Sequence, residues 1–147
     1  MKNLIYIPLL ILIISCSNDI ENNNTETIDK NKTYNWRLVT SWPKNYPGLG
    51  MAPEKIAELV EEMSDGQMKI TVYGAEEQVP AFGVFDAVST GSHQMGHSGG
   101  YFWKGKVPAA QFFTSVPFGL TADEINAWVN KGGGLELWRE IYAPFNI

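Results

Sequence analysis

The sequence predicts an α/β domain over residues 34–147, and three observations support this fold class. Short segments alternate between apolar and polar residues, as strands do, and longer segments repeat apolar residues at helical spacing. Glycine and proline separate these segments. The order strand, helix, strand, helix is typical of a parallel sheet whose strands are joined by helices.

The first half of the domain contains two predicted strand–helix units. Residues 34–41 alternate as a strand, and Trp42-Pro43 with Tyr46-Pro47-Gly48 indicates the loop that follows. A helix begins near Pro53 and ends at residues 65–66. Its expected buried face consists of Ile56, Leu59, Val60 and Met63. Residues 68–73 form the second strand and residues 80–90 a short helix. The inward residues of that helix are expected to be Phe82, Phe85 and Val88, or Val84 and Val88.

The second half is predicted to contain two strands and two helices. Residues 94–97 and 111–115 are the expected strands, with an aromatic, glycine-rich loop between them. Thr121 and Glu124 form a capping-box pattern at the start of a helix that ends at the glycines 132–134. Its buried face is Ile125, Trp128 and Val129. A last helix runs to Pro144, with its apolar side at Leu135, Trp138, Ile141 and Tyr142.

The first 33 residues are predicted to lie outside this fold. Lys2 and the apolar run that follows it indicate a secretory signal over residues 1–16, too short to span a bilayer. Ser15 before the single cysteine is typical of a lipoprotein cleavage site, so we expect Cys16 to be lipidated and to anchor the protein. A plain signal with an incidental cysteine is the alternative. Residues 17–33 are polar and are expected to form a disordered tether.

The charge distribution excludes nucleic acid as a partner. The chain has a net charge of −5 and no cluster of lysine or arginine. Arg37 and Arg139 are its only arginines. We interpret Arg37 as part of an ion pair on a strand face. Arg139 is expected to make solvated pairs with Glu136 and Glu140 on its helix.

Two short patterns could carry enzyme or metal chemistry. Residues 96–100, GHSGG, fit the nucleophile elbow of serine hydrolases around Ser98. The elbow needs an Asp and a His later in the chain, but the only histidines, His93 and His97, precede Ser98. A glycine-rich loop that permits close backbone approach is the favoured interpretation. His93 and His97 have zinc-like spacing only on a helix, which Gly91 and Gly96 disfavour, so we expect no metal site and no cofactor.

Several long strings resemble a known protein family. They are VTSWPKNYPGLG, MSDGQMKITVYGAEEQVPAFGVFDAVSTG, MGHSGGYFWKGKVPAAQFFTSVPFGL and GGGLELWREIYAPF. Together they resemble the solute-binding subunit of a tripartite ATP-independent periplasmic transporter, most closely the 2-oxoacid-binding branch, over residues 36–147. The resemblance implies a periplasmic-binding-protein-like fold, of which this chain is the first lobe of two, with the second lobe largely missing.

The resemblance also implies a function, which is binding and not catalysis. Such a protein captures a small organic acid, a 2-oxoacid such as pyruvate or a related monocarboxylate, and delivers it to membrane subunits of the transporter. It is expected in the periplasm or outer cell envelope, anchored to a membrane by lipid. Whether it is a monomer or a homodimer is left open.

Three residues are implied as substrate contacts. Tyr101 matches the pocket tyrosine of the family, Phe118 in SVPFG lies beside the cleft, and Trp42 is a weaker candidate. From the residues alone, Tyr101 is equally well a core aromatic. In related proteins the arginine that binds the carboxylate comes later than residue 147. We therefore expect a partial chain with one wall of a cleft; a lipid-anchored serine hydrolase and a fragment without function of its own are the alternatives.

Overall fold

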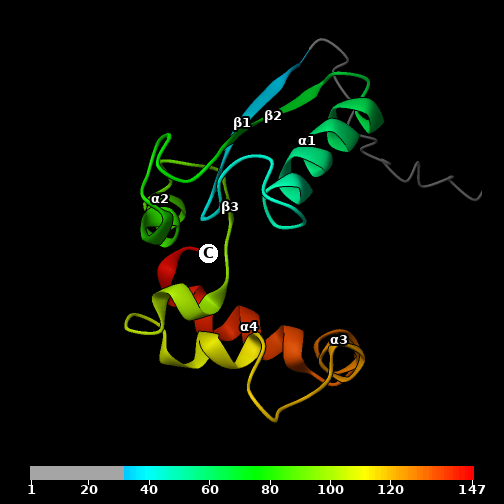
Figure 1. The fold of residues 1–147 in the computed structure, drawn as a ribbon. Helices are drawn as coiled ribbons and strands as arrows, with labels where there is room; N and C mark the ends of the chain where they lie inside the picture. The colour runs from blue at the N-terminus through cyan, green and yellow to red at the C-terminus, as the bar shows by residue number, and fades with distance from the viewer. Residues whose placement is uncertain (1–31) are drawn as a thin grey trace, which may run out of the picture.

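The structure is a computed structural model that describes residues 32–147 (Figure 1). The predicted signal segment with Cys16 lies outside the described residues. The same holds for the predicted tether up to residue 31.

Three parallel strands form the sheet, in the order β2-β1-β3. They are β1 (Tyr34–Thr40), β2 (Met68–Tyr73) and β3 (Met95–His97), close to three of the four strands expected from the sequence. Val39 of β1 is paired with Tyr73 on one side and Gly96 on the other. Because all three strands run in the same direction, their carboxyl ends meet at one edge of the sheet.

Two helices connect the strands, which confirms the α/β order (Figure 1). Helix α1 (Met51–Met63) packs against β2, while α2 (Val84–Ser89), preceded by the 3-10 turn η1 (Ala81–Gly83), packs against β3 and β1. Gly96 permits the close approach of α2. A Cβ atom at Gly96 would lie 2.8 Å from Val88 and 2.9 Å from Val84. Val39, Val84 and Ala87 form the small core on this face.

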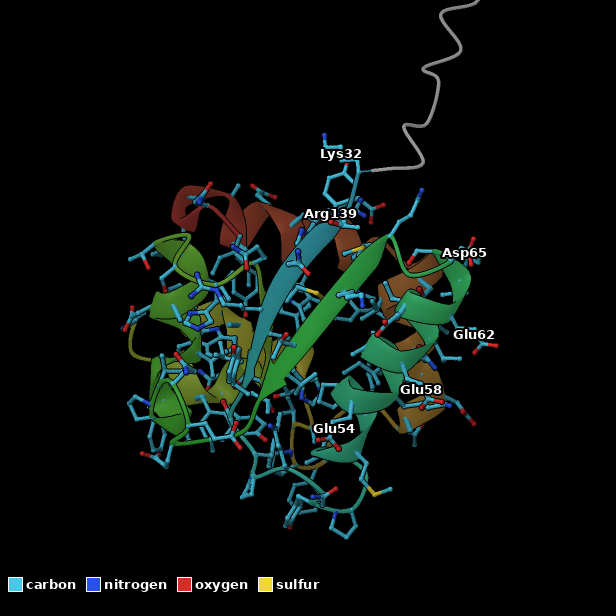
Figure 2. All side chains as sticks on the ribbon, turned by 90° about the horizontal axis from the view of Figure 1, so that it is seen from above. Lys32, Glu54, Glu58, Glu62, Asp65 and Arg139 are labelled. Atoms are coloured by element: carbon cyan, nitrogen blue, oxygen red, sulfur yellow. The ribbon has the colours of Figure 1, made fainter. Side chains whose placement is uncertain are left out.

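The apolar side predicted for α1 is wrong in most positions. Met63 is 77% exposed, and Ile56 and Leu59 are also exposed, whereas Pro53 is the buried residue of the helix. Helix α1 packs mainly against β2, which is an edge strand of the described three-stranded sheet, so much of the predicted apolar side stays uncovered. Figure 2 shows acidic side chains along the outer side of the same helix, at Glu54, Glu58 and Glu62.

The segment after β3 is helical, and the strand predicted at residues 111–115 is wrong. Two 3-10 helices, η2 (Gly100–Trp103) and η3 (Pro108–Phe113), occupy this region. Pro108 stands at the start of η3, where its fixed φ suits a helical turn and its missing N–H leaves no donor unpaired. The Ala110 amide then donates to the Val107 carbonyl at 3.0 Å. The helical turn that begins at Pro108 therefore continues through residues 111–113, although the pattern of residues 111–115 is typical of a strand.

Two helices and a final turn complete the described chain. Helix α3 (Ala122–Lys131) begins with the predicted capping box: Thr121 accepts from the Glu124 amide and the Glu124 carboxylate accepts from the Thr121 amide at 2.8 Å. Helix α4 (Gly134–Tyr142) is followed by η4 (Ala143–Phe145). No helix within residues 32–147 combines the length and apolar character needed to cross a membrane.

A second core joins these C-terminal helices to α2. Phe85, Val107, Ala110 and Tyr142 are buried together. The indole N–H of Trp103 donates to the Tyr142 hydroxyl at 2.8 Å, so the aromatic segment and α4 are linked by a hydrogen bond as well as by packing. Phe82, one of the residues expected to face inward, is exposed and lies outside this core.

Candidate functional site

The strand order creates a crevice at the carboxyl ends of β1 and β3. From β1 the chain passes through α1 to β2 on one side, and then crosses to β3 on the other side of β1. In open parallel sheets, ligands bind outside the carboxyl ends of the strands where the strand order reverses in this way. The residues that end these two strands are therefore the first candidates for a site.

A pair of serines joins the two strand ends. The hydroxyl of Ser41 lies 2.5 Å from the hydroxyl of Ser98, and it also donates to the carbonyl of Ala81 at 2.7 Å. Because the single proton of Ser41 is used on Ala81, Ser98 is the donor in the serine pair. The bonds therefore connect the end of β1, the end of β3 and the start of η1.

Thr40 and His97 form a second link between the same strands. The Thr40 hydroxyl oxygen lies 3.2 Å from Nδ1 of His97 and accepts a hydrogen bond from the Trp42 amide at 3.3 Å. Thr40 is fully buried. Burial lowers the pKa of His97 below its ordinary value, which favours the neutral ring at pH 7. The carbonyl of Trp42 accepts from the Ala75 amide at 3.0 Å, so the Trp42 backbone is held on both sides.

Four aromatic side chains lie beside these strand ends, three following β1 or β3 and one on η1, and we call them the aromatic wall: Trp42, Phe82, Tyr101 and Phe102. Phe102 is central, with ring-centre distances of 5.9 Å to Trp42, 5.2 Å to Phe82 and 4.9 Å to Tyr101. The Trp42 ring also lies 5.0 Å from the His97 ring. Tyr101 is 48% exposed, so the wall has an open side that a ligand can contact.

Glycines 99 and 100 allow the wall to form. A Cβ atom at Gly99 would lie 2.6 Å from the ring of Tyr101, and one at Gly100 would lie 2.5 Å from the carbonyl oxygen of Ala110. Both positions need the close approach that only glycine permits. This supports the interpretation of the GHSGG segment as a close-packed loop.

The same geometry does not support a serine hydrolase at Ser98. A nucleophilic serine donates its proton to a base, usually a histidine. Here the Ser98 hydroxyl donates to Ser41, and Nδ1 of His97 faces Thr40. Nor do the described residues contain a group of three or more His, Cys, Asp or Glu side chains arranged to hold a metal ion.

Two of the three predicted contacts are brought together, and one is not. Trp42 and Tyr101 meet through Phe102 in the aromatic wall. Phe118 is fully exposed with a left-handed backbone (φ 59°), and no described ring contact joins it to the wall. Thr40 and Ser41 were not among the residues predicted from the sequence, although a Thr-Ser pair at a strand end is a recognisable signal once the strands are known to be neighbours.

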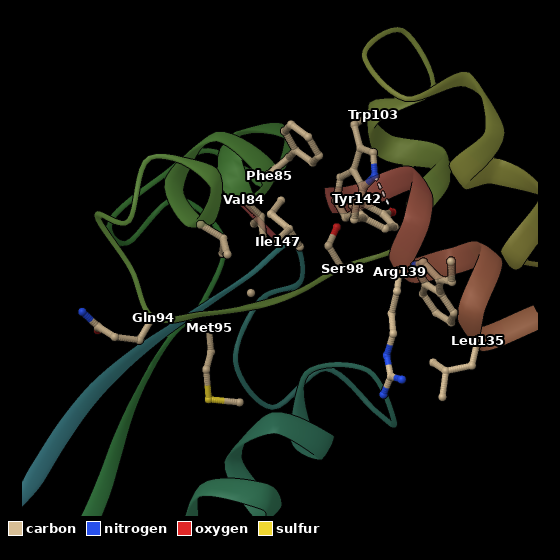
Figure 3. A pocket seen from close by; sticks show the side chains of 13 residues that line it. Val84, Phe85, Gln94, Met95, Ser98, Trp103, Leu135, Arg139, Tyr142 and Ile147 are labelled. Carbon is tan, nitrogen blue, oxygen red and sulfur yellow. Dashed lines mark hydrogen bonds between the residues drawn. The ribbon is translucent and has the colours of Figure 1, made fainter. Parts of the chain in front are cut away.

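The two arginines differ from their predicted roles. The Arg37 guanidinium donates to the Ser92 carbonyl, and no described carboxylate pairs with it. Arg139 forms no ion pair with a described carboxylate, so the predicted pairs with Glu136 and Glu140 are absent. Its side chain extends beside a cavity (Figure 3).

That cavity, of about 530 Å³, lies along the outer side of β3 (Figure 3). Its walls are mainly apolar side chains of α2, β3 and α4, such as Phe85, Met95 and Trp138. Neither Trp42 nor Tyr101 lines it. The polar side chains that also line it are Gln94, Ser98 and Arg139, and the Ser98 hydroxyl already donates to Ser41, so few donors remain there for a small, strongly hydrated acid. We therefore place the candidate site for a small polar ligand at the strand ends and not in this cavity.

The chain is similar to bacterial proteins that bind solutes outside the cytoplasm. The model of the DctP family, bacterial extracellular solute-binding protein family 7, matches residues 38–146. A monocarboxylate 2-oxoacid-binding periplasmic protein of Nostoc sp. is 42% identical over 136 residues, which cover 92% of this chain and 36% of the relative.

Solved structures of solute-binding proteins, including the following two, are also similar to this chain. One is a TRAP periplasmic solute-binding protein from Pseudoalteromonas atlantica with bound sodium and pyruvate, at 47% identity and a TM-score of 0.75. The match covers 78% of this chain and 35% of that one. The other is a TRAP solute-binding protein from Bordetella bronchiseptica, a dimer of mixed occupancy in which one active site holds copurified calcium and picolinate and the other is apo. It is 36% identical with a TM-score of 0.76, over 79% of this chain and 34% of that one.

Proposed function

The chain belongs to family 7 of the bacterial extracellular solute-binding proteins, and we propose that it forms the first lobe of a protein that captures a small organic acid for a TRAP transporter. The proteins of this family bind solutes and are not enzymes. The observation that supports the proposal best is the aromatic wall with its hydroxyl groups, located where the order of a parallel sheet reverses.

The ligand we propose is a 2-oxoacid such as pyruvate, or a related monocarboxylate. The Nostoc relative is named for binding 2-oxoacids, and one solved relative holds pyruvate. The polar atoms of pyruvate are all acceptors, so its site must offer donors. Tyr101 has a phenolic hydroxyl and Trp42 an indole N–H, and both rings also give the methyl group of the acid an apolar surface. Phe118, exposed on its loop, remains a proposed third contact.

Capture requires a second wall. The chain spans 36% of the Nostoc relative and about 35% of the two solved relatives. In the proposed mechanism, a second lobe closes on the acid by a hinge motion, because the acid binds the closed state more tightly than the open one. The first lobe alone is expected to bind weakly, since no arginine fork is part of its aromatic wall.

A cation accompanies the ligand in the two solved relatives. The residues described for this chain do not fit such a site, because no group of three or more acidic, histidine or cysteine side chains gathers among them. We therefore assign no role to a cation on this lobe.

The proposed location is the periplasm or outer cell envelope, with Cys16 as the lipid anchor and residues 17–33 as the tether. The cysteine after an apolar run supports this proposal. Metabolic labelling with a palmitate analogue should mark the wild type and not Cys16→Ala. Membrane subunits of the transporter are the proposed partners. A homodimer remains a further proposal, supported by the dimeric Bordetella relative, and sedimentation of the purified protein tests it.

Tryptophan fluorescence tests the function directly. Addition of pyruvate to a complete protein with both lobes should change the emission in a saturable way, because Trp42 belongs to the wall. No saturable change with 2-oxo, 2-hydroxy and dicarboxylic acids would refute the proposed substrate class. An active-site serine probe that labelled Ser98 would instead support the hydrolase alternative. If the lobe is a fragment without function of its own, a complete protein with both lobes should bind while this chain does not.

A further inference from the structure

We propose that His97 is a ligand contact that neither the sequence patterns nor the comparisons assign: a neutral histidine whose Nε2–H donates a hydrogen bond to a carboxylate oxygen of the captured acid. This inference rests on the proposed function. It follows from the direction of the hydrogen bonds around the ring and from the place of His97 at the carboxyl end of β3.

The hydrogen bonds of Thr40 determine which ring nitrogen of His97 carries the proton. Thr40 has no exposed surface, so water cannot accept its hydroxyl proton. The Trp42 amide is a donor to the same oxygen and cannot accept it. Nδ1 of His97, at 3.2 Å, is the described acceptor that remains. Nδ1 therefore holds the lone pair, and the neutral ring must carry its proton on Nε2.

The Nε2 atom of His97 is open to a ligand. Its ring makes one described hydrogen bond, which uses Nδ1. Within residues 32–147, the buried side-chain polar atom that lacks a partner is Nε2 of His93, not that of His97. Nε2 of His97 is therefore not fully buried, and the His97 ring lies 5.0 Å from the Trp42 ring of the aromatic wall. A donor at this position complements an acid that has only acceptors.

His93, at the other end of β3, has the opposite tautomer. The Ser92 hydroxyl donates to the Ala87 carbonyl at 2.9 Å, so it can only accept from Nδ1 of His93, which lies 3.1 Å away. Nδ1 of His93 therefore carries the proton, and its buried Nε2 is a bare lone pair. Since the chain has two histidines, His93 is an internal control in any experiment that observes all histidines.

The first part of the test is a nitrogen-15 NMR spectrum of the 147-residue chain with labelled histidine, recorded without ligand near pH 7.5. Couplings from the ring nitrogens to the carbon-bound protons distinguish the two neutral tautomers. We expect one histidine protonated at Nε2 and one at Nδ1, assigned to His97 and His93 by substitution of each. A His97 ring protonated at Nδ1 would overturn the proposal.

The second part measures pyruvate binding by His97→Leu and His97→Gln. Leucine removes the donor, and glutamine keeps both an acceptor for Thr40 and a donor for the ligand. We expect the affinity to fall about tenfold in His97→Leu, the equivalent of about 1.4 kcal/mol, and to stay within about threefold of wild type in His97→Gln. Thermal melts of both variants report folding. If His97→Leu does not fold, the wild-type spectrum answers the question instead: a shift of the His97 Nε2 resonance on addition of pyruvate would support the contact, and no shift would overturn it.

The outcomes separate this inference from the proposed function. If wild type binds pyruvate, while His97→Leu binds equally well or the Nε2 resonance does not move, the role of His97 is wrong and the proposed function stands. If neither this chain nor a complete protein with both lobes binds any acid of the panel, both are wrong. Weaker binding by His97→Leu with recovery in His97→Gln supports both.

Discussion

The hydroxyl of Ser41 lies 2.5 Å from the hydroxyl of Ser98, so the carboxyl ends of β1 and β3 are joined by side chains as well as by the sheet. Ser41 is nearly buried and uses its own proton on the Ala81 carbonyl. The backbone segments that carry Trp42, Phe82 and Tyr101 begin at these bonded residues. The serine pair therefore holds in place the backbone segments that carry the side chains of the aromatic wall.

Replacement of Ser41 by alanine should destabilise the lobe. Ser41→Ala leaves the Ala81 carbonyl and the Ser98 hydroxyl without their partner, and an unpaired buried group costs about 1–3 kcal/mol. The free energy of unfolding from urea titrations measures the loss. Ser115→Ala is the control, because Ser115 is exposed. Equal stabilities of the two variants would show that the serine pair contributes nothing.

Replacement of Gly99 by alanine should disturb the wall. The new methyl group would lie 2.6 Å from Cε1 of Tyr101, so the tyrosine ring has to move. We expect weaker pyruvate binding and a changed Tyr101 signal in NMR spectra. Gly105→Ala is a matched control, because a Cβ atom there meets nothing within 4 Å. Unchanged affinity in Gly99→Ala would indicate that the position of the Tyr101 ring does not matter.

The Tyr101 hydroxyl is predicted to donate to the ligand. Tyr101→Phe keeps the ring and its contact with Phe102 but removes the donor. One such hydrogen bond to a charged oxygen contributes about 1.5–3 kcal/mol, so the dissociation constant should rise about tenfold or more. Titration calorimetry of Tyr101→Phe and of Tyr46→Phe, an exposed tyrosine outside the wall, measures the difference. The same affinity in both variants would remove Tyr101 from the site.

Phe118→Ala separates binding from folding at the third predicted contact. The Phe118 side chain is fully exposed, so the melting temperature should not change. The proposed contact requires weaker ligand binding by the variant when both lobes are present. Normal affinity there would leave Phe118 as an ordinary exposed residue.

The buried His93 should make the lobe less stable in mild acid. Burial, and secondarily the positive charge of Arg37, lower the pKa of His93 below 6.5 in the folded state. The Tyr73 ring packs against it, and no described acceptor faces Nε2 to receive a hydrogen bond from the N–H that protonation would create. The unfolded chain then binds more protons than the folded one, so stability is complete above about pH 6.5 and declines as the pH falls toward the lowered pKa.

Urea titrations at about pH 7.5 and pH 5.5 measure this loss. His93→Gln should lose less stability between the two values than wild type does, because its side chain does not titrate. The pKa of His97 is also lowered by burial, so His97→Gln is measured in the same way to find how much of the loss of stability comes from His97. An equal loss in wild type and His93→Gln would contradict the prediction.

The sequence was sufficient for the elements whose signals are local. The capping box of Thr121 and Glu124 and the strand–helix order were predicted because they depend on neighbouring residues. The strand at residues 111–115 was wrong because Pro108 begins a 3-10 helix ahead of it.

The site could be predicted only in part. Tyr101 and Trp42 came from a family resemblance, whereas the bonds of Ser41 to Ser98 and of Thr40 to His97 depend on which strands are neighbours. Both pairs are 57 residues apart in the chain, and their contact is set by the pairing of β1 with β3. The exposure of Met63 and Phe118 likewise depends on which elements pack nearby.

The most direct test of the account is an NMR titration of the isotope-labelled chain with pyruvate. We expect saturable shifts of the Trp42 indole, the Tyr101 ring and the His97 ring, with little change at Trp138 in the cavity beside β3. Shifts confined to the cavity, or no saturable shift at all, would contradict a ligand site at the carboxyl ends of β1 and β3.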